Sequence, residues 1–321
     1  MSEYYIGVDL GGTKIYTALA DETGKVLAKI KLLTESNRGI DKVFENIVES
    51  INIVIKDADI DRSSVRRIGV GSPGPLNIDE GIIYTAPNLE NWVNIKIVKI
   101  LEDKTGIPVL LENDANAAAL GEKWFGAGKE ANNMLYMTVS TGIGGGIIVN
   151  KKIYHGSSDT AGEVGHMIIK PDGPTCGCGN PGCLETFASG TAVARKGRQV
   201  LHKSTILQEL SKGNPDNIDG ALVAQAAELG DFEAQKIWRE EGYYLGIGLA
   251  NLINIFNFDM ILLGGGVMNS WELFADEMFK NIKKYAFEST YSQAVIKKAA
   301  LGSEVGVIGA VAVAMGDRLL S

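Results

Sequence analysis

The chain has 321 residues, of which 45% are hydrophobic and 22% charged, and its formal net charge is −8. This length favours two domains with buried cores, and the acidic balance argues against nucleic acid or an anionic membrane as the main partner. No apolar run approaches the length of a membrane span, and the N-terminus has no basic region or signal core. Three clustered cysteines do not suit a disulfide framework, so we expect a cytoplasmic protein.

The first part of the chain predicts an α/β domain. Strands are expected at 4–9, 14–20, 26–33, 68–71 and 109–111. A glycine turn at 11–13 separates the first two, and helical periodicity covers 40–55. The strand at 109–111 leads into Glu112-Asn113-Asp114-Ala115-Asn116 and then an alanine-rich helix that extends to about residue 125.

The same pattern restarts about 130 residues later, with a strand at 134–139, a glycine-rich turn at 140–146 and a return strand. This weak internal repeat suggests a duplicated α/β domain. Further helices are expected at 184–201, 218–229, 232–254, 271–285 and 305–315, with Ser303 as a possible cap of the last, and strands at 259–263 and 295–299. We predict one domain from 1–115 together with the C-terminal helix at 305–321, and a second from 116–304.

All three cysteines lie within eight residues, and one histidine precedes them by ten positions. Thiolates and imidazole are the ligands that structural zinc prefers, and such a site needs four. Bystander thiols would not cluster so tightly, Cys-x-Cys is too short for a redox pair, and the surroundings are not basic enough for a nucleic-acid ribbon. We therefore predict structural Zn²⁺ bound by His166, Cys176, Cys178 and Cys183. Glu163 and Glu185 flank these ligands.

Three glycine-rich turns follow strands and can cradle phosphate groups with backbone N–H groups. None matches a P-loop, and the G-x-G-x-x-G match at 69–74 is discounted because Pro73 and Pro75 oppose a helix start. Beside the first turn, Asp9 suits Mg²⁺ and Lys14 a phosphate oxygen, although the two could also form a surface ion pair. The predicted nucleotide-binding residues are Asp9, Gly11, Gly12, Thr13, Lys14, Thr141, Gly142, Gly144, Gly145, Gly264, Gly265 and Gly266.

Asp114 is the predicted catalytic residue. It lies at a strand-to-helix boundary, where the helix dipole and free N–H groups favour a carboxylate. A carboxylate held beside a substrate hydroxyl can orient it and accept its proton. The alternative is a helix cap, a role that Asn113 or Asn116 could take instead.

These motifs resemble the signatures of the ROK family of repressors, open-reading-frame proteins and sugar kinases, over essentially the whole chain. One signature is matched from Gly142 to His166 and the other from Cys176 to Glu185. The turn at 9–14 resembles the family's first phosphate motif, and 112–116 its catalytic segment. The resemblance implies an α/β, two-domain actin/hexokinase-like (ribonuclease H-like) ATPase fold, with ATP and sugar in a cleft and the last helix crossing back to the first domain.

Within the family the chain is most similar to glucokinases. This implies ATP-dependent phosphorylation of glucose to glucose 6-phosphate, with Asp114 as the base and with ATP, Mg²⁺ and Zn²⁺ as cofactors. The implied sugar-binding residues are Gly74, Asn88, Asn113, Asp114, Glu163, His166 and Glu185. His166 would be shared, with one ring nitrogen on zinc and the other facing the sugar.

Several alternatives stay open. Fructose, mannose, N-acetylglucosamine or N-acetylmannosamine could replace glucose, and polyphosphate could replace ATP. A sugar-sensing repressor would carry a helix-turn-helix ahead of the first strand, where only residues 1–3 stand, so we do not expect one. A non-catalytic sugar-binding protein would leave Asp114 and the phosphate turns without a role. The family implies a homodimer or homotetramer.

Overall fold

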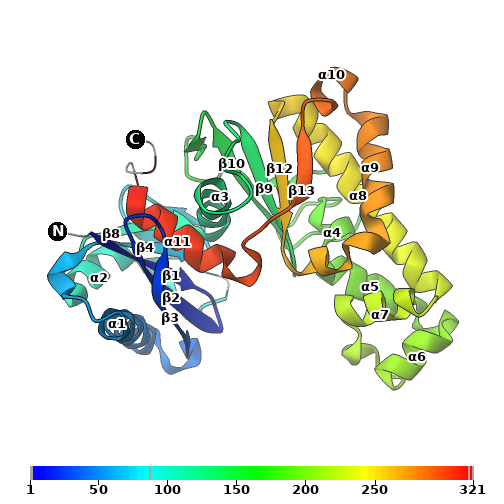
Figure 1. Ribbon diagram of the computed structural model, residues 1–321. Coiled ribbons are helices and arrows are strands. Elements are labelled where there is room, and N and C mark those ends of the chain that lie inside the picture. The colour runs from blue at the N-terminus through cyan, green and yellow to red at the C-terminus, as the bar shows by residue number, and fades with distance from the viewer. Residues whose placement is uncertain (1–2, 87, 317–318, 320–321) are drawn as a thin grey trace. The chain divides into compact units, whose positions relative to one another are not determined.

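The computed structural model describes residues 3–86, 88–316 and 319. The chain divides into two compact units (Figure 1): unit 1 is Met1–Asn132, Gly146–Gly162 and Ala299–Ser321, and unit 2 is Asn133–Gly145 and Glu163–Lys298. The predicted boundary after residue 115 does not coincide with this division, because helix α3 (Asp114–Trp124) packs within unit 1 against helix α11 (Val305–Met315). Residues 317, 318, 320 and 321 of the predicted C-terminal segment lie outside the described residues.

Unit 1 is built on a five-stranded sheet of order β3-β2-β1-β4-β8. Its strands are β1 (Tyr4–Leu10), β2 (Lys14–Asp21), β3 (Val26–Leu33), β4 (Val65–Ser72) and β8 (Val109–Asn113). β4 is parallel to both β1 and β8, so the carboxyl ends of these three strands meet at one edge of the sheet. That edge carries Asp9, Gly74 and Asp114 on or just after the strand ends, where open α/β sheets place their ligands.

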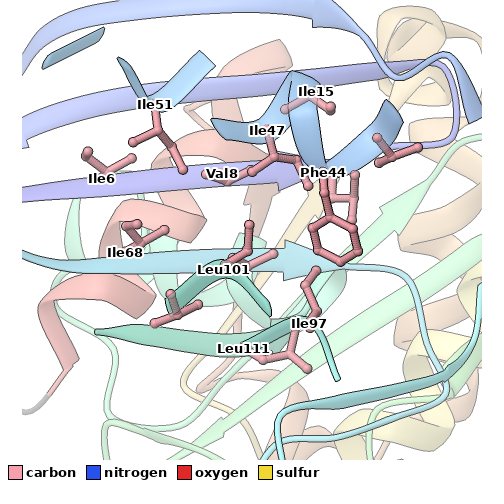
Figure 2. Close-up of a cluster of buried hydrophobic side chains, with 14 of the residues drawn as sticks. Ile6, Val8, Ile15, Phe44, Ile47, Ile51, Ile68, Ile97, Leu101 and Leu111 are labelled. Carbon is pink, nitrogen blue, oxygen red and sulfur yellow. The ribbon is translucent and has the colours of Figure 1, made fainter. Parts of the chain in front are cut away.

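One face of this sheet packs against helices α1 (Ile40–Asp57) and α2 (Ile97–Thr105), and strand alternation turns Ile6 and Val8 toward them. Figure 2 shows this core, with Ile6, Val8, Ile15, Phe44, Ile47, Ile51, Ile68, Ile97, Leu101 and Leu111 labelled. A small sheet of β5 (Leu76–Asn77), β6 (Ile82–Thr85) and β7 (Val93–Ile95) completes the unit. Neither α2 nor this small sheet, whose strands are only two to four residues long, was predicted from the sequence.

The opposite face of the sheet packs against α11, which has the predicted bounds (Figure 1). A Cβ atom at Gly7 would lie 2.4 Å from the backbone N of Val311, and one at Gly69 would lie 2.2 Å from the O of Ala310. Glycine is therefore required where helix and strand backbones touch. Gly69 belongs to the discounted G-x-G-x-x-G match, and the packing of α11 explains why this residue is a glycine.

The predicted cap of α11 is wrong. Its N-cap residue is Glu304, without a side-chain cap hydrogen bond, and not Ser303. The Glu304 carboxylate instead accepts a hydrogen bond from Tyr16 Oη at 2.9 Å and pairs with Lys29. Because both partners lie in the sheet of unit 1, Glu304 links the start of α11 to that sheet.

A second five-stranded sheet has the order β11-β10-β9-β12-β13. Its strands are β9 (Met134–Val139), β10 (Ile143–Val149), β11 (Lys152–Ile153), β12 (Met260–Gly264) and β13 (Val295–Lys298). β12 is parallel to both β9 and β13, as β4 is to β1 and β8. The two sheets thus share one topology, as the internal sequence repeat predicted.

The helices of unit 2 are α4 (Glu185–Ala188), α5 (Gly190–Val200), α6 (Thr205–Ser211), α7 (Gly220–Glu228), α8 (Phe232–Phe256), α9 (Trp271–Tyr285) and α10 (Glu288–Tyr291). The single helix predicted at 184–201 is divided, because the Ser189 side chain accepts a hydrogen bond from Ala192 N and caps a new helix. Helices α8 and α9 pack closely at Gly242. None of the described helices combines the length and hydropathy that a membrane span requires.

Gly7→Ala is expected to lower the free energy of unfolding by about 1–3 kcal/mol, because the added methyl group must push α11 away from the sheet. Urea denaturation measures this difference. Gly220→Ala is the control, since the nearest atoms lie 3.6 Å from its Cβ position. Equal stability of the two variants would contradict the close packing.

Candidate active site

The start of α3 places Asp114. Asn113 is the N-cap residue, and its Oδ1 accepts hydrogen bonds from Ala115 N at 2.9 Å and Asn116 N at 3.3 Å. Asp114 is the first helical residue, and its Oδ1 also accepts a hydrogen bond from Ala115 N, at 2.8 Å. Since Asn113 fills the capping role, the Asp114 carboxylate does not have to.

The surroundings of Asp114 suit a base. Burial among protein atoms raises the pKa of Asp114, and hydrogen bonding from the Ala115 backbone acts in the opposite direction. The side chain nevertheless keeps an exposed side. Burial, and then the charge of Asp114, raise the pKa of Asp9 to about 6, while Lys31 lowers it. The two carboxylates therefore share one electrostatic environment at the sheet edge.

The buried carboxylate of Glu112 holds the start of α3 by hydrogen bonds. Glu112 is 5% exposed, and its Oε1 accepts hydrogen bonds from Asn113 N at 2.9 Å and Asn116 Nδ2 at 3.0 Å. Its Oε2 lies 2.8 Å from His155 Nε2. Glu112 thus connects the cap residue, the first turn of α3 and a distant histidine.

The first glycine turn brings other predicted residues together. A Cβ atom at Gly12 would lie 2.4 Å from the backbone O of Asn88, so Asn88 packs directly on this turn. Gly11 N donates to Lys14 O, and Thr13 O accepts from Thr34 N, which fixes the turn. Lys14 is exposed, and among the described residues no salt bridge joins it to Asp9. Gly74 lies near the cap, with a Cβ position 3.8 Å from Asn113 Nδ2.

The predicted zinc ligands converge in unit 2. One ligand atom each from His166, Cys176, Cys178 and Cys183 lie within 4.8 Å of one another. The sulfur atoms of Cys178 and Cys183 are 3.6 Å apart, and His166 Nδ1 is 3.5 Å from Cys176 Sγ. Tetrahedral zinc with bonds of about 2.3 Å places sulfur ligands about 3.8 Å apart, so the donor set fits the ion. The other ring nitrogen, His166 Nε2, lies 3.9 Å from Glu163 Oε2.

Glu185, the first residue of α4, connects the cysteine cluster to the second glycine turn. Its Oε2 accepts a hydrogen bond from Ile143 N at 2.8 Å, and its Oε1 lies 3.7 Å from Cys176 Sγ. A Cβ atom at Gly142 would lie 2.3 Å from Oε2, so a larger residue there would have to displace the Glu185 carboxylate. Gly142, Cys176 and Glu185 line one cavity of about 330 Å³.

A neighbouring cavity of about 480 Å³ joins the second and third glycine turns of unit 2. Thr141 and Gly266 line it, together with Gly190 at the start of α5. Gly264 ends β12, and Gly265 has a φ of +89°, a conformation that favours glycine. Gly144 and Gly145 lie in β10. Of the predicted nucleotide residues of unit 2, Thr141 and Gly266 thus line a space large enough for a small-molecule ligand.

The residues that hold the start of α3, Glu112, Asn116 and His155, were not predicted from the sequence. Glu112 and Asn116 both belong to the segment 112–116, and their spacing of four residues across a helix start could have indicated a hydrogen bond between their side chains. His155 had no local signal, because it pairs with a residue 43 positions away. Arg198, Asp219 and Asn269, which line the larger cavity, likewise come from separate segments.

The sequence profile of the ROK family matches residues 5–317, and the chain therefore belongs to the ROK family. A glucokinase of Halalkalibacterium halodurans is 37% identical over 309 residues, which cover 95% of this chain and 93% of that protein. A xylose repressor of Caldicellulosiruptor bescii is 32% identical over 314 residues, which cover 98% of this chain and 78% of the repressor.

A solved ROK family glucokinase from Streptomyces griseus, in complex with glucose and AMPPNP, matches with a TM-score of 0.81 and 34% identity. The match covers 97% of this chain and 99% of that chain. The predicted family and the α/β, actin/hexokinase-like fold class are thereby confirmed.

We expect one zinc ion per chain, measurable by metal analysis of the purified protein. Cys178→Ser should lose the ion and lower the melting temperature by at least about 5 °C, because metal binding contributes folding free energy. Cys178 is exposed, so the substitution leaves packing intact. Gly177→Ala is the control, with no atom within 4 Å of its Cβ position. A folded, zinc-free wild-type protein would contradict the site.

Proposed function

We propose that this protein is an ATP-dependent glucokinase that transfers the γ-phosphoryl group of ATP to the 6-hydroxyl of glucose. The observation that carries the proposal is the Asp114 carboxylate, which is not needed as a cap and has a raised pKa. The glucokinase relatives, at 34–37% identity over nearly the whole chain, support the same activity.

Glucose recognition is assigned to polar groups on each unit. In unit 1 these are Asn88, Asn113 and the backbone at Gly74, which lie at or near the carboxyl edge of the sheet. In unit 2 they are Glu163, His166 and Glu185. Carboxylates accept charge-assisted hydrogen bonds from sugar hydroxyls, and zinc on Nδ1 of His166 would leave Nε2 for the sugar.

The nucleotide is assigned to the glycine turns, whose backbone N–H groups suit phosphate oxygens. The cavity beside Thr141 and Gly266 would take the nucleoside part of ATP. Magnesium bound with ATP supplies neutralisation of the phosphate charge. Asp9 would hold it, since a divalent cation favours the ionised form of a carboxylate whose pKa burial raises to about 6.

The chemical step needs little from the protein beyond alignment, charge stabilisation and one proton acceptor. The O6 atom of glucose forms a bond to the γ-phosphorus while the bond to the β–γ bridging oxygen breaks, and ADP leaves. Asp114 accepts the O6 proton. Its raised pKa suits this role, because a base works best with a pKa near the working pH.

A coupled ADP-release assay over a panel of hexoses tests the proposal. Glucose is expected to give the highest kcat/KM, with fructose, mannose, N-acetylglucosamine and N-acetylmannosamine as competitors. A preference for another hexose would reassign the substrate. If no hexose of the panel leads to ADP release, the result would favour the sugar-sensing regulators that the family also contains, such as the xylose repressor.

Asp114→Asn should lower kcat by roughly 10²–10⁴-fold, the usual contribution of a positioned base. Steady-state kinetics measure it, and zinc content and circular dichroism should match the wild type because Asn113 still caps α3. Asp103→Asn, at an exposed aspartate of α2, is the control. A kcat near the wild-type value would reject Asp114 as the base.

Gly144→Val should raise the KM for ATP far more than the KM for glucose. The valine side chain would keep phosphate oxygens away from the backbone of the second glycine turn. Initial-rate kinetics with each substrate varied in turn separate the two effects. An unchanged KM for ATP would argue that phosphates do not bind along this turn.

A further inference from the structure

Glu112 is the most constrained carboxylate near the start of α3. It is buried, and its two oxygens have partners in three places: the backbone of Asn113, the side chain of Asn116 and the ring of His155. Oε1 serves the catalytic segment, and Oε2 faces His155 at 2.8 Å. The orientation of the Glu112 carboxylate therefore depends both on the start of α3 and on His155.

His155 belongs to a different part of unit 1. It follows the short strand β11 (Lys152–Ile153), and its carbonyl accepts a hydrogen bond from Ala161 N at 3.1 Å. Its side chain is 34% exposed, whereas that of Glu112 is 7% exposed. The pair thus joins a partly open histidine to a carboxylate that water hardly reaches.

We propose that His155 is a positioning residue for phosphoryl transfer, which by hydrogen bonding to Glu112 fixes the cap of α3 and thereby Asp114. The inference rests on the proposed function, because that function makes Asp114 the base. His155 itself touches no reacting atom.

The physical reason is the cost of a buried carboxylate oxygen without a partner. Without His155, Glu112 Oε2 would lose its charge-assisted hydrogen bond in a poorly hydrated place. The carboxyl group would then rotate toward water or take up a proton. Either change weakens its hydrogen bonds to Asn113 N and Asn116 Nδ2, which hold the first turn of α3. Small displacements of a catalytic group lower kcat steeply.

Charge strengthens the pair. The hydrogen bond to Glu112 raises the pKa of His155, burial lowers it, and the charges of Glu112, Asp159 and Asp79 raise it further. Lys151 and Lys152 line the same cavity as the pair. Because the folded-state pKa is raised, the imidazolium form persists to higher pH, and the attraction between the two opposite charges is lost as pH rises through that pKa.

His155→Ala tests the proposal, with kcat, both KM values, melting temperature and pH profile as readouts. It should lower kcat by roughly 10- to 100-fold at pH 7 and change the KM for ATP little. His155→Gln, whose side-chain amide can reach the position of Nε2, should restore most of kcat. His202→Ala, at an exposed histidine of unit 2, is the control.

The pH profile separates positioning from a merely structural role. Wild-type kcat should fall at low pH as Asp114 is protonated and fall partly at high pH as His155 loses its proton. His155→Gln should keep the acid limb and lack the alkaline one. Wild-type kcat in His155→Ala, or an unchanged alkaline limb in His155→Gln, would overturn the proposal. Failure of the wild-type protein to phosphorylate any hexose would instead overturn the proposed function.

Discussion

A helix must satisfy its first backbone amides, and the way α3 does so decides what Asp114 can do. The Asn113 side chain accepts from two of these amides, so the next residue is released from capping. Glu112 beneath it holds the backbone of Asn113 and the amide of Asn116. A carboxylate is thereby presented at the sheet edge with a raised pKa, and every later step of the proposed chemistry depends on that placement.

Direct backbone packing keeps this edge in place. Helix α11 contacts β1 and β4 at Gly7 and Gly69, and a Cβ atom at Gly309 would lie 2.2 Å from Ala117 O of α3. Glycines at these points let the C-terminal helix touch both the sheet and α3. A Cβ atom at Gly306 would lie 2.4 Å from Asp9 Oδ2, so the same helix also borders the carboxylate assigned to magnesium. One helix therefore packs against the helix that begins at Asp114 and borders the Asp9 carboxylate.

The sequence predicts features whose determinants lie close together in the chain. The cysteine cluster spans eight residues, and the small apolar run at 305–315 gave the bounds of α11 correctly. Features that depend on distant partners escaped prediction. The N-cap residue of α11 is Glu304, not Ser303, and its carboxylate contacts Tyr16 and Lys29 in distant strands. His155 pairs with Glu112, 43 positions away in the chain. The roles of the sugar-binding residues came from the family resemblance, whereas the strand-to-helix boundary alone made Asp114 the catalytic candidate, with a helix cap as the alternative.

The most direct test of this account is the identity of the product. The protein is incubated with ATP and ¹³C-labelled glucose, and the product is examined by phosphorus and carbon magnetic resonance. The account predicts one ADP for each glucose 6-phosphate, with phosphorus coupled to carbon 6. Phosphate at another position, or release of inorganic phosphate without a phosphorylated sugar, would contradict it.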